Sequence, residues 1–302
     1  MSRIAYVNGR YVPHRDATVH VEDRALQFGD GVYEVCEVLN GRLVDEGRHL
    51  DRLERSLGEI RIPMPMDRAA VGVVLRELVR RNRVTNGIVY LQVTRGVAPR
   101  NHPFPLKPVR PGVIGTAKSL KVAETERRAA EGIAVVTTPD NRWGRVDIKT
   151  VGLLPNVLAK QAAREAGAFE AWFVDGAGNV TEGSSTNAWI VTGDDRLVTR
   201  QTDHGILPGV TRSVLFDMVA ALGLTLEERP FSLDEALAAK EAFLSGSSAT
   251  VLPIVMVDGK KIGEGRPGPI ALRLRRAFHD HAELAPAWSV HQDKRETGQK
   301  KS

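Results

Sequence analysis

The chain has 302 residues, a length that favours about two domains over one small core. Hydrophobic residues make up 42% and charged residues 26% of the sequence, which is ordinary for a globular protein, and no apolar run approaches the ~20 residues needed to span a bilayer. The net charge is +5, but acidic and basic residues are interleaved along the chain and do not form a basic face that could bind a nucleic acid. Neither a nucleic acid nor a membrane is therefore expected as a partner.

The N-terminal segment predicts strands joined by tight turns. Residues 4–20 carry short strand patterns around Asn8-Gly9, which is a strong hairpin signal. A glycine-rich turn ending at Gly31 leads into a further strand, with Tyr33 close to its start. The tyrosine either packs against its neighbours or presents its phenol to a cleft.

Two helices are expected next, over residues 48–59 and 67–82. The first is amphipathic because leucines recur at helical spacing. Arg52 lies beside that apolar stripe, so it belongs either to a solvated helix face or to a site for a buried anion. The second helix precedes a strand over residues 88–93.

A proline-stiffened loop after this strand contains Arg100 and His102. Residues two apart in an extended loop face the same way, so the guanidinium and the imidazole could converge on one carboxylate. The pair alone is a weak signal.

The domain division is placed in the polar stretch that follows the next strand. We expect an N-terminal α/β domain over residues 1–117, a linker over 118–122 and a C-terminal domain over 123–286. Residues 287–302 are polar and lack periodicity, so they are expected to form a disordered tail.

The second domain opens with a strand over residues 132–136, followed by Lys149 just before a helix over 155–166. A lysine held against apolar neighbours loses hydration of its ammonium, which makes the neutral, nucleophilic amine easier to reach. Taken alone, Lys149 is more readily explained as an ordinary exposed lysine.

Three further segments contain groups that suit a phosphorylated cofactor. Glu182 stands among small hydroxyl residues and a glycine, where the backbone can approach a ligand closely. A glycine-containing turn feeds a helix that starts near Val210 and Thr211, which is a natural phosphate site. A buried strand over 242–245 runs into a second candidate phosphate loop at Ser247 and Ser248.

Together these groups suggest pyridoxal 5'-phosphate. Lys149 would condense with the aldehyde, and Glu182 would keep the pyridine nitrogen protonated so that the ring can take up electrons. Arg52 and the two phosphate segments would bind the phosphate. The sequence has no nucleotide-binding fingerprint and no metal-ligand spacing, so no metal is expected.

Several separated motifs give the sequence a close resemblance to the D-amino acid aminotransferases of the fold-type IV pyridoxal phosphate enzymes. The resemblance runs from about residue 3 to about residue 282. The motifs, in order, are Phe28-Gly29-Asp30-Gly31-Val32-Tyr33-Glu34, His49-Leu50-Asp51-Arg52-Leu53, Gln92-Val93-Thr94-Arg95-Gly96, Asp147-Ile148-Lys149, Thr181-Glu182-Gly183-Ser184-Ser185 and Leu207-Pro208-Gly209-Val210-Thr211-Arg212. The resemblance implies a two-domain fold of mixed α/β (α+β) class, with the active site at the domain interface.

The resemblance also assigns roles to residues. Lys149 would be the Schiff-base lysine that moves the substrate proton, Glu182 would hold the pyridine nitrogen, and Leu207 would pack against the ring. Tyr33, Arg100 and His102 would bind the substrate carboxylate, the last two reaching in from the other subunit of a homodimer. The phosphate would be bound by Arg52, Val210, Thr211, Ser247 and Ser248, with serines where the family more often has threonine.

The implied activity is ping-pong transamination of D-amino acids with a 2-oxo acid acceptor, of the type D-alanine plus 2-oxoglutarate to pyruvate plus D-glutamate. Alternatives within the fold are an (R)-amine or L-branched-chain transaminase and an aminodeoxychorismate lyase. A catalytically inactive homologue is a further alternative, which the intact Lys149 and Glu182 disfavour. The Arg100-x-His102 arrangement separates the D-amino acid interpretation from the branched-chain one.

The expected compartment is the cytoplasm. Cys36 is the only cysteine, so no internal disulfide can form. The N-terminus goes directly into strand-like sequence and lacks the apolar core and cleavage site of a signal peptide.

Overall fold

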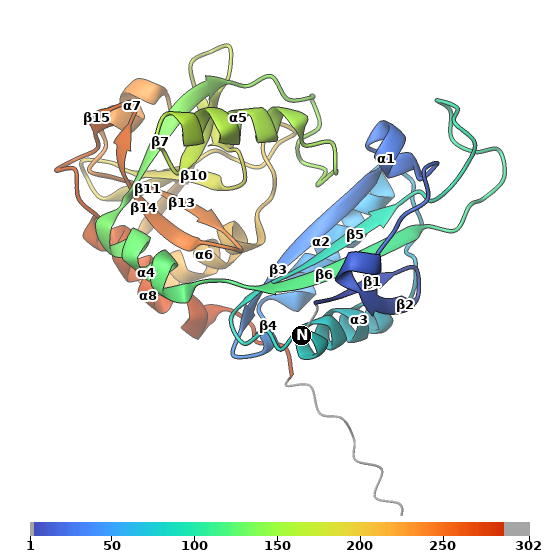
Figure 1. Cartoon of the computed structure of the whole chain (residues 1–302). Helices are drawn as coiled ribbons and strands as arrows, with labels where there is room; N and C mark the ends of the chain where they lie inside the picture. Colours follow the sequence, from blue (N-terminus) through green and yellow to red (C-terminus); the bar gives the residue numbers. More distant parts are fainter. Residues whose placement is uncertain (1–2, 287–302) are drawn as a thin grey trace, which may run out of the picture.

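The computed structural model describes residues 3–286, which form two lobes, each built on its own β-sheet (Figure 1). This arrangement confirms the expected mixed α/β class. The predicted tail at 287–302 lies outside the described residues. The predicted domain limits stay a proposal; the last strand of the first sheet extends to Ser119 and the next helix begins at Val122.

The N-terminal lobe contains an antiparallel six-stranded sheet. Its strands, in spatial order, are β2 (Arg10–Pro13), β1 (Ile4–Val7), β6 (Gly112–Ser119), β5 (Gly87–Thr94), β3 (Gly31–Leu39) and β4 (Arg42–Leu43). The hairpin predicted at Asn8-Gly9 is present: both residues have positive φ, 48° and 95°, and they join β1 to β2. This is the backbone conformation that asparagine and glycine tolerate best.

Helices α2 (Glu46–Glu59) and α3 (Arg68–Arg81) pack on this sheet, close to the predicted limits. Their apolar stripes meet in one core, with Leu53 of α2 and Leu78 of α3 fully buried. A short helix that the sequence did not predict, α1 (Arg24–Phe28), precedes β3. Its N-terminus is capped by the carboxylate of Asp23, and it ends at Gly29 in a left-handed conformation.

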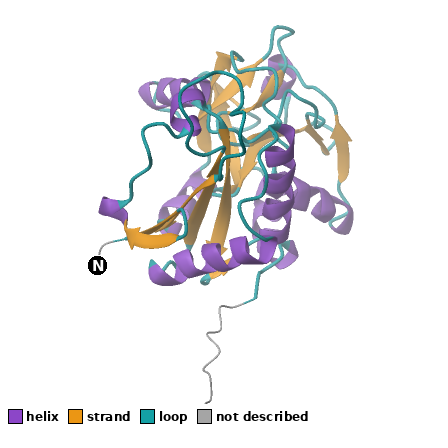
Figure 2. Ribbon diagram, turned by 90° about the vertical axis from the view of Figure 1, so that its right-hand side faces the viewer, coloured by secondary structure: helices purple, strands orange, loops and turns teal. Residues whose placement is uncertain are grey.

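The C-terminal lobe contains a mixed nine-stranded sheet. Its strands, in spatial order, are β12 (Thr225–Glu228), β11 (Arg196–Thr199), β10 (Asn187–Val191), β13 (Glu241–Gly246), β14 (Thr250–Val257), β7 (Ile133–Pro139), β8 (Glu170–Val174) and β9 (Val180–Gly183), with β15 (Lys260–Lys261) paired to β14. The surrounding helices are α4 (Val122–Glu131), α5 (Leu154–Glu165), α6 (Val210–Ala221), α7 (Leu233–Ala238) and α8 (Pro269–His281). Figure 2 shows the strands flanked by helices.

The end of the described chain ties the two lobes together. Arg42 of β4 donates to two consecutive backbone carbonyls, those of Leu284 and Ala285, at 2.9 and 2.7 Å. Close by, His279 of α8 contacts the carboxylate of Glu37 on β3 at 3.0 Å. These contacts hold β3, which also reaches the functional site, against the C-terminal lobe.

The contact between His279 and Glu37 predicts a pH-dependent contribution to stability. The hydrogen bond with Glu37 raises the pKa of His279 above its ordinary value of 6.5, against opposition from burial and from Arg275. The stabilisation is therefore complete below the unfolded pKa and is lost as the pH rises through the folded pKa. We expect His279→Gln to lower the free energy of unfolding by up to about 1 kcal/mol at acidic pH and to lose this effect at alkaline pH.

Urea unfolding across this pH range measures the effect. His281→Gln is the matched control, because His281 is exposed and contacts only a backbone carbonyl on its own helix. A destabilisation by His279→Gln that grows as the pH rises would contradict the prediction.

Candidate functional site

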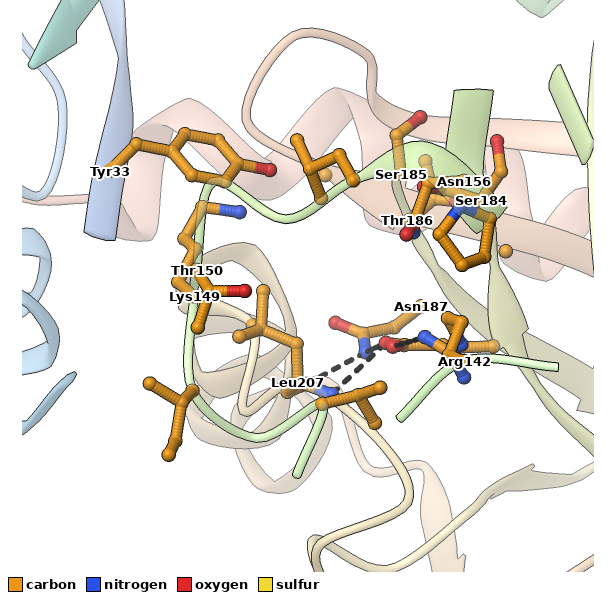
Figure 3. Close-up of a pocket in the computed structure, with 18 of the residues that line it drawn as sticks. Tyr33, Arg142, Lys149, Thr150, Asn156, Ser184, Ser185, Thr186, Asn187 and Leu207 are labelled. Atoms are coloured by element: carbon orange, nitrogen blue, oxygen red, sulfur yellow. Dashed lines mark hydrogen bonds and ion pairs between the residues drawn. The ribbon is translucent and has the colours of Figure 1, made fainter. Parts of the chain in front are cut away.

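A cavity of about 580 Å³ lies where the two lobes meet (Figure 3). Most of the residues singled out in the sequence line it, although they are spread over more than two hundred positions. Those residues are Tyr33, Arg52, Lys149, Glu182, Leu207, Val210, Thr211 and Ser247. Ser248, Arg100 and His102 are not among the lining residues.

Lys149 lies on a segment that docks onto the N-terminal lobe. The backbone N–H of Tyr33 donates to the carbonyl of Lys149 at 3.0 Å, and that of Val151 donates to the carbonyl of Gly31 at 3.1 Å. Ile148 is buried in the core of the N-terminal lobe. With the backbone fixed on both sides, the Lys149 ammonium faces the cavity, 4.2 Å from the centre of the Tyr33 ring.

A buried carboxylate with two partly exposed arginines fixes the chain two residues before the lysine. The carboxylate of Asp147, only 3% exposed, pairs with Arg55 of α2 and with Arg145. Burial on its own would raise the pKa of Asp147, but hydrogen bonds from Arg145 and Arg55 hold it below its ordinary value. Asp147 is therefore an anion at neutral pH, and it clamps the Lys149 segment to α2.

Glu182 faces the cavity from the end of β9, with three hydrogen-bond donors around its carboxylate. Arg142 pairs with one oxygen, and the other accepts from the Asn187 side chain at 3.2 Å and from the Leu207 N–H at 3.1 Å. Burial raises the pKa of Glu182, while Arg142 opposes that rise. A carboxylate offers about four acceptor positions, so one remains for a donor in the cavity.

Arg142 and Asn187 are functional-site residues that the sequence reasoning missed. The side chain of Arg142 is 4% exposed, pairs with Asp140 at 2.7 Å and lies over the ring of Phe173. Both side chains donate to the Glu182 carboxylate, and Figure 3 shows Arg142 and Asn187 beside each other. One sequence feature could have pointed to Arg142. Asp140 directly follows the strand that ends at Pro139, and an arginine two residues further on is a natural partner for its carboxylate.

Arg52 is buried, and it does reach an anion. Its guanidinium binds both oxygens of Glu34 at 2.8 Å, and it also donates to the carbonyl of Pro208 at 3.1 Å. Burial alone would raise the pKa of Glu34, but Arg52 and His49 lower it to about 2. Burial lowers the pKa of His49, so the neutral ring donates its Nδ1 hydrogen to Glu34, which can only accept.

The N-terminus of α6 opens into the cavity beside Arg52. No side chain caps this helix, so the backbone N–H groups of its first turn, at Val210 and Thr211, are available to an anion. The preceding residue is glycine for a steric reason: a Cβ on Gly209 would come 2.0 Å from the side-chain oxygen of Asn187. A helix N-terminus and a guanidinium are both groups that attract anions such as phosphate.

The loop between β13 and β14 places its two serines differently. Ser247 lines the main cavity, whereas Ser248 is exposed and lines a separate, smaller cavity beside α4.

A carboxylate that the sequence reasoning did not consider, Glu170, lies beneath the residues 184–186 that line the cavity. It is completely buried and accepts hydrogen bonds from three consecutive hydroxyls, those of Ser184, Ser185 and Thr186.

Arg100 and His102 lie on the exposed loop between β5 and β6. Both pack against Phe28: the Arg100 guanidinium is 5.2 Å and the His102 ring 5.4 Å from the Phe28 ring centre. Phe28 itself lines the cavity. Both side chains therefore contact the same ring, and neither lines the cavity of its own chain.

Within residues 3–286, no cluster of three or more His, Cys, Asp or Glu side chains is placed to hold a metal ion. No helix in that part of the chain is long and apolar enough to cross a membrane.

Comparison with known proteins identifies the family. The family model for amino-transferase class IV matches residues 31–257, and the chain belongs to this family. A D-alanine aminotransferase from Listeria innocua serovar 6a is 41% identical over 273 residues, which cover 90% of this chain and 93% of that protein. The D-alanine aminotransferase of Bacillus licheniformis is 39% identical over 90% of this chain and 95% of its own length.

Solved structures agree on the fold. The branched-chain amino acid aminotransferase of Escherichia coli superposes with a TM-score of 0.85 at 26% identity, covering 93% of this chain and 94% of that one. A second branched-chain amino acid aminotransferase, from T.th. and solved with pyridoxamine 5'-phosphate, gives a TM-score of 0.84 with the same identity and coverage.

The Glu34–Arg52 pair yields a prediction about stability. Arg52→Ala leaves a buried carboxylate with only His49 as partner, so we expect a loss of about 3–5 kcal/mol in the free energy of unfolding. Replacing both partners, as Glu34→Leu with Arg52→Met, removes the uncompensated charge and should cost less than Arg52→Ala alone. Chemical denaturation of the cofactor-free proteins measures both; a double variant less stable than Arg52→Ala would contradict the prediction.

Proposed function

We propose that this protein is a pyridoxal phosphate-dependent transaminase of D-amino acids. The observation that carries the proposal is one cavity that holds a lysine amine, a paired glutamate and an uncapped helix N-terminus with an arginine beside it. The relatives that are about 40% identical over most of the chain are D-alanine aminotransferases, which supports the D-amino acid class.

The residues around the cavity fit the cofactor. Arg52, the N–H groups of Val210 and Thr211, and Ser247 would bind the phosphate. Glu182 would accept the hydrogen of the pyridine nitrogen at its remaining acceptor position, and Leu207 would pack against the ring. When bound, pyridoxal phosphate supplies an aldehyde that condenses with amines and a ring that takes up the electrons of the substrate Cα–H bond.

Lys149 performs the proton transfers in this proposal. The Lys149 amine faces the cavity and would take the α proton of the substrate and later return it. Before substrate binds, the same amine would hold the aldehyde of the cofactor. Arg142 opposes the rise that burial causes in the pKa of Glu182, and Glu182 would hold the pyridine nitrogen. Transfer of the amino group to a 2-oxo acid would use the same residues, as in a ping-pong cycle.

The substrate carboxylate would be bound by Tyr33 together with Arg100 and His102 from the second subunit of a homodimer. Two features support the homodimer. The arginine and the histidine lie outside the cavity of their own chain. Helices α1 and α5 and the β5–β6 loop also expose apolar side chains that a second copy would cover; these are Leu26, Phe104, Leu106, Leu154, Val157 and Leu158.

Transamination of L-branched-chain amino acids is the second candidate, because the solved structures quoted above are branched-chain enzymes. Their 26% identity is well below that of the D-alanine aminotransferases, so we place this candidate second.

For the compartment, we propose the cytoplasm: the single thiol, Cys36, is buried and unbridged, as in proteins of a reducing environment.

Half-reaction spectroscopy tests the proposed function. The visible absorption of the lysine-bound cofactor should disappear on addition of D-alanine but not of L-alanine or L-leucine, and a 2-oxo acid should restore it. Lys149→Ala should lack that absorption and lose more than about 10³-fold in kcat, because it lacks the proton carrier. Bleaching by L-leucine alone would instead favour the branched-chain activity.

Mixing two inactive variants tests the shared site. Lys149→Ala retains the carboxylate-binding pair, and Arg100→Ala retains the lysine. If the arginine acts across a dimer, each heterodimer contains one intact site, so the random mixture should recover about one quarter of the wild-type activity towards D-alanine. Activity no greater than that of the separate variants would place Arg100 in its own subunit's site.

A further inference from the structure

The loop that carries Arg100 and His102 is held by a buried arginine of α1. Arg24, whose side chain is 3% exposed, donates from Nη1 to the carbonyl of Asn101 at 2.6 Å and from Nη2 to the carbonyl of His102 at 3.2 Å. Both carbonyls belong to the segment Arg100–His102, which carries the proposed carboxylate-binding pair. One guanidinium therefore fixes two consecutive peptide planes of this loop.

Arg24 is itself fixed by its third nitrogen. Its Nε donates to Asp30 at 2.8 Å, and the same Asp30 oxygen accepts from Nε of Arg95 at 2.7 Å. Arg95 also donates to the backbone carbonyl of Ile60, and its guanidinium lies 3.6 Å from the ring centre of Phe104, further along the loop. The Arg24–Asp30–Arg95 chain thus fastens the loop at two places.

Fixing these peptide planes also sets where the functional side chains point. Phe28, four residues after Arg24 on the same short helix, has Arg24 against its ring at 4.7 Å and the Arg100 and His102 side chains at 5.2 and 5.4 Å. The guanidinium and the imidazole therefore both contact one aromatic ring before any substrate is present. A preordered pair binds a carboxylate without first losing its own conformational freedom.

We propose that Arg24 is a positioning residue for the substrate carboxylate, acting through the backbone carbonyls of Asn101 and His102 on the side chains of Arg100 and His102. This inference rests on the proposed D-amino acid function. It holds whether the loop serves the cavity of its own subunit or that of a second copy. Arg24 is not among the residues that line the cavity; its guanidinium packs against Phe28, which does line it.

Steady-state kinetics of the holoenzyme with Arg24→Lys test the proposal. The lysine keeps the charge beside Asp30 but cannot reach both carbonyls. We expect KM for D-alanine to rise on the order of ten-fold, with kcat within about two-fold of wild type, because the carboxylate contact is present in ground and transition states alike. The visible cofactor absorption should be unchanged.

Arg42→Lys is the matched control. Arg42 also donates to two consecutive backbone carbonyls, but at the lobe junction, so its replacement should leave KM unchanged. When Arg100 is already replaced by alanine, adding Arg24→Lys should raise KM for D-alanine only slightly further, because the effect of Arg24 passes largely through Arg100. An unchanged KM, equal losses for Arg24→Lys and Arg42→Lys, or full additivity with Arg100→Ala would each overturn the proposal.

Hydrogen exchange provides a measurement that does not depend on substrate. Arg24→Lys, or Arg24→Gln if the lysine variant does not fold, should speed amide exchange across residues 98–104 and leave residues 147–153 as in wild type. If D-alanine is not a substrate but exchange still rises only in the loop, the proposed function fails while the loop-fixing role survives. Unchanged exchange in the loop would overturn the positioning role itself.

Discussion

The antiparallel contact between β3 and the residues around Lys149 is the constraint on which the site depends. The lysine belongs to the second half of the chain, but its carbonyl is bound by the N–H of Tyr33, and its neighbour Ile148 is buried in the first lobe's core. One strand therefore supplies the phenol at the cavity and the backbone that holds the lysine. Because the hydrogen bonds at Tyr33 and Val151 are made by the main chain, they depend little on which side chains line the rest of the cavity.

Helix α2 connects this contact to the buried charges. Arg52 and Arg55 are three residues apart and so lie on one face of the helix. The first binds Glu34 and the turn before α6, and the second binds Asp147 in the lysine segment. Both of these carboxylates are matched by an arginine, which lowers the pKa that burial would raise. The helix thus contacts both the turn before α6 and the lysine segment.

Local sequence patterns predicted most of the elements of the fold but only some of the residues that line the cavity. The hairpin at Asn8-Gly9 and the two amphipathic helices follow from turn chemistry and leucine spacing, which act over a few residues. Arg142 and Asn187 were not found, because each contributes to the site only through Glu182, which Arg142 reaches from the loop after β7 and Asn187 from the start of β10. Ser247 and Ser248 are adjacent in sequence, and the opposite directions of their side chains depend on the loop conformation, which composition does not determine.

The division between chemistry and selectivity explains why the fold does not identify the substrate. At 26% identity, branched-chain amino acid aminotransferases share the whole architecture with a TM-score of 0.85. What distinguishes the proposed D-amino acid site is the loop between β5 and β6, which is held by Arg24 and Arg95 rather than by the residues around Lys149. Since swapping the carboxylate and side-chain pockets inverts the accepted hand while the lysine stays on one face, changes confined to this loop and its supports can alter selectivity without disturbing the proton transfers.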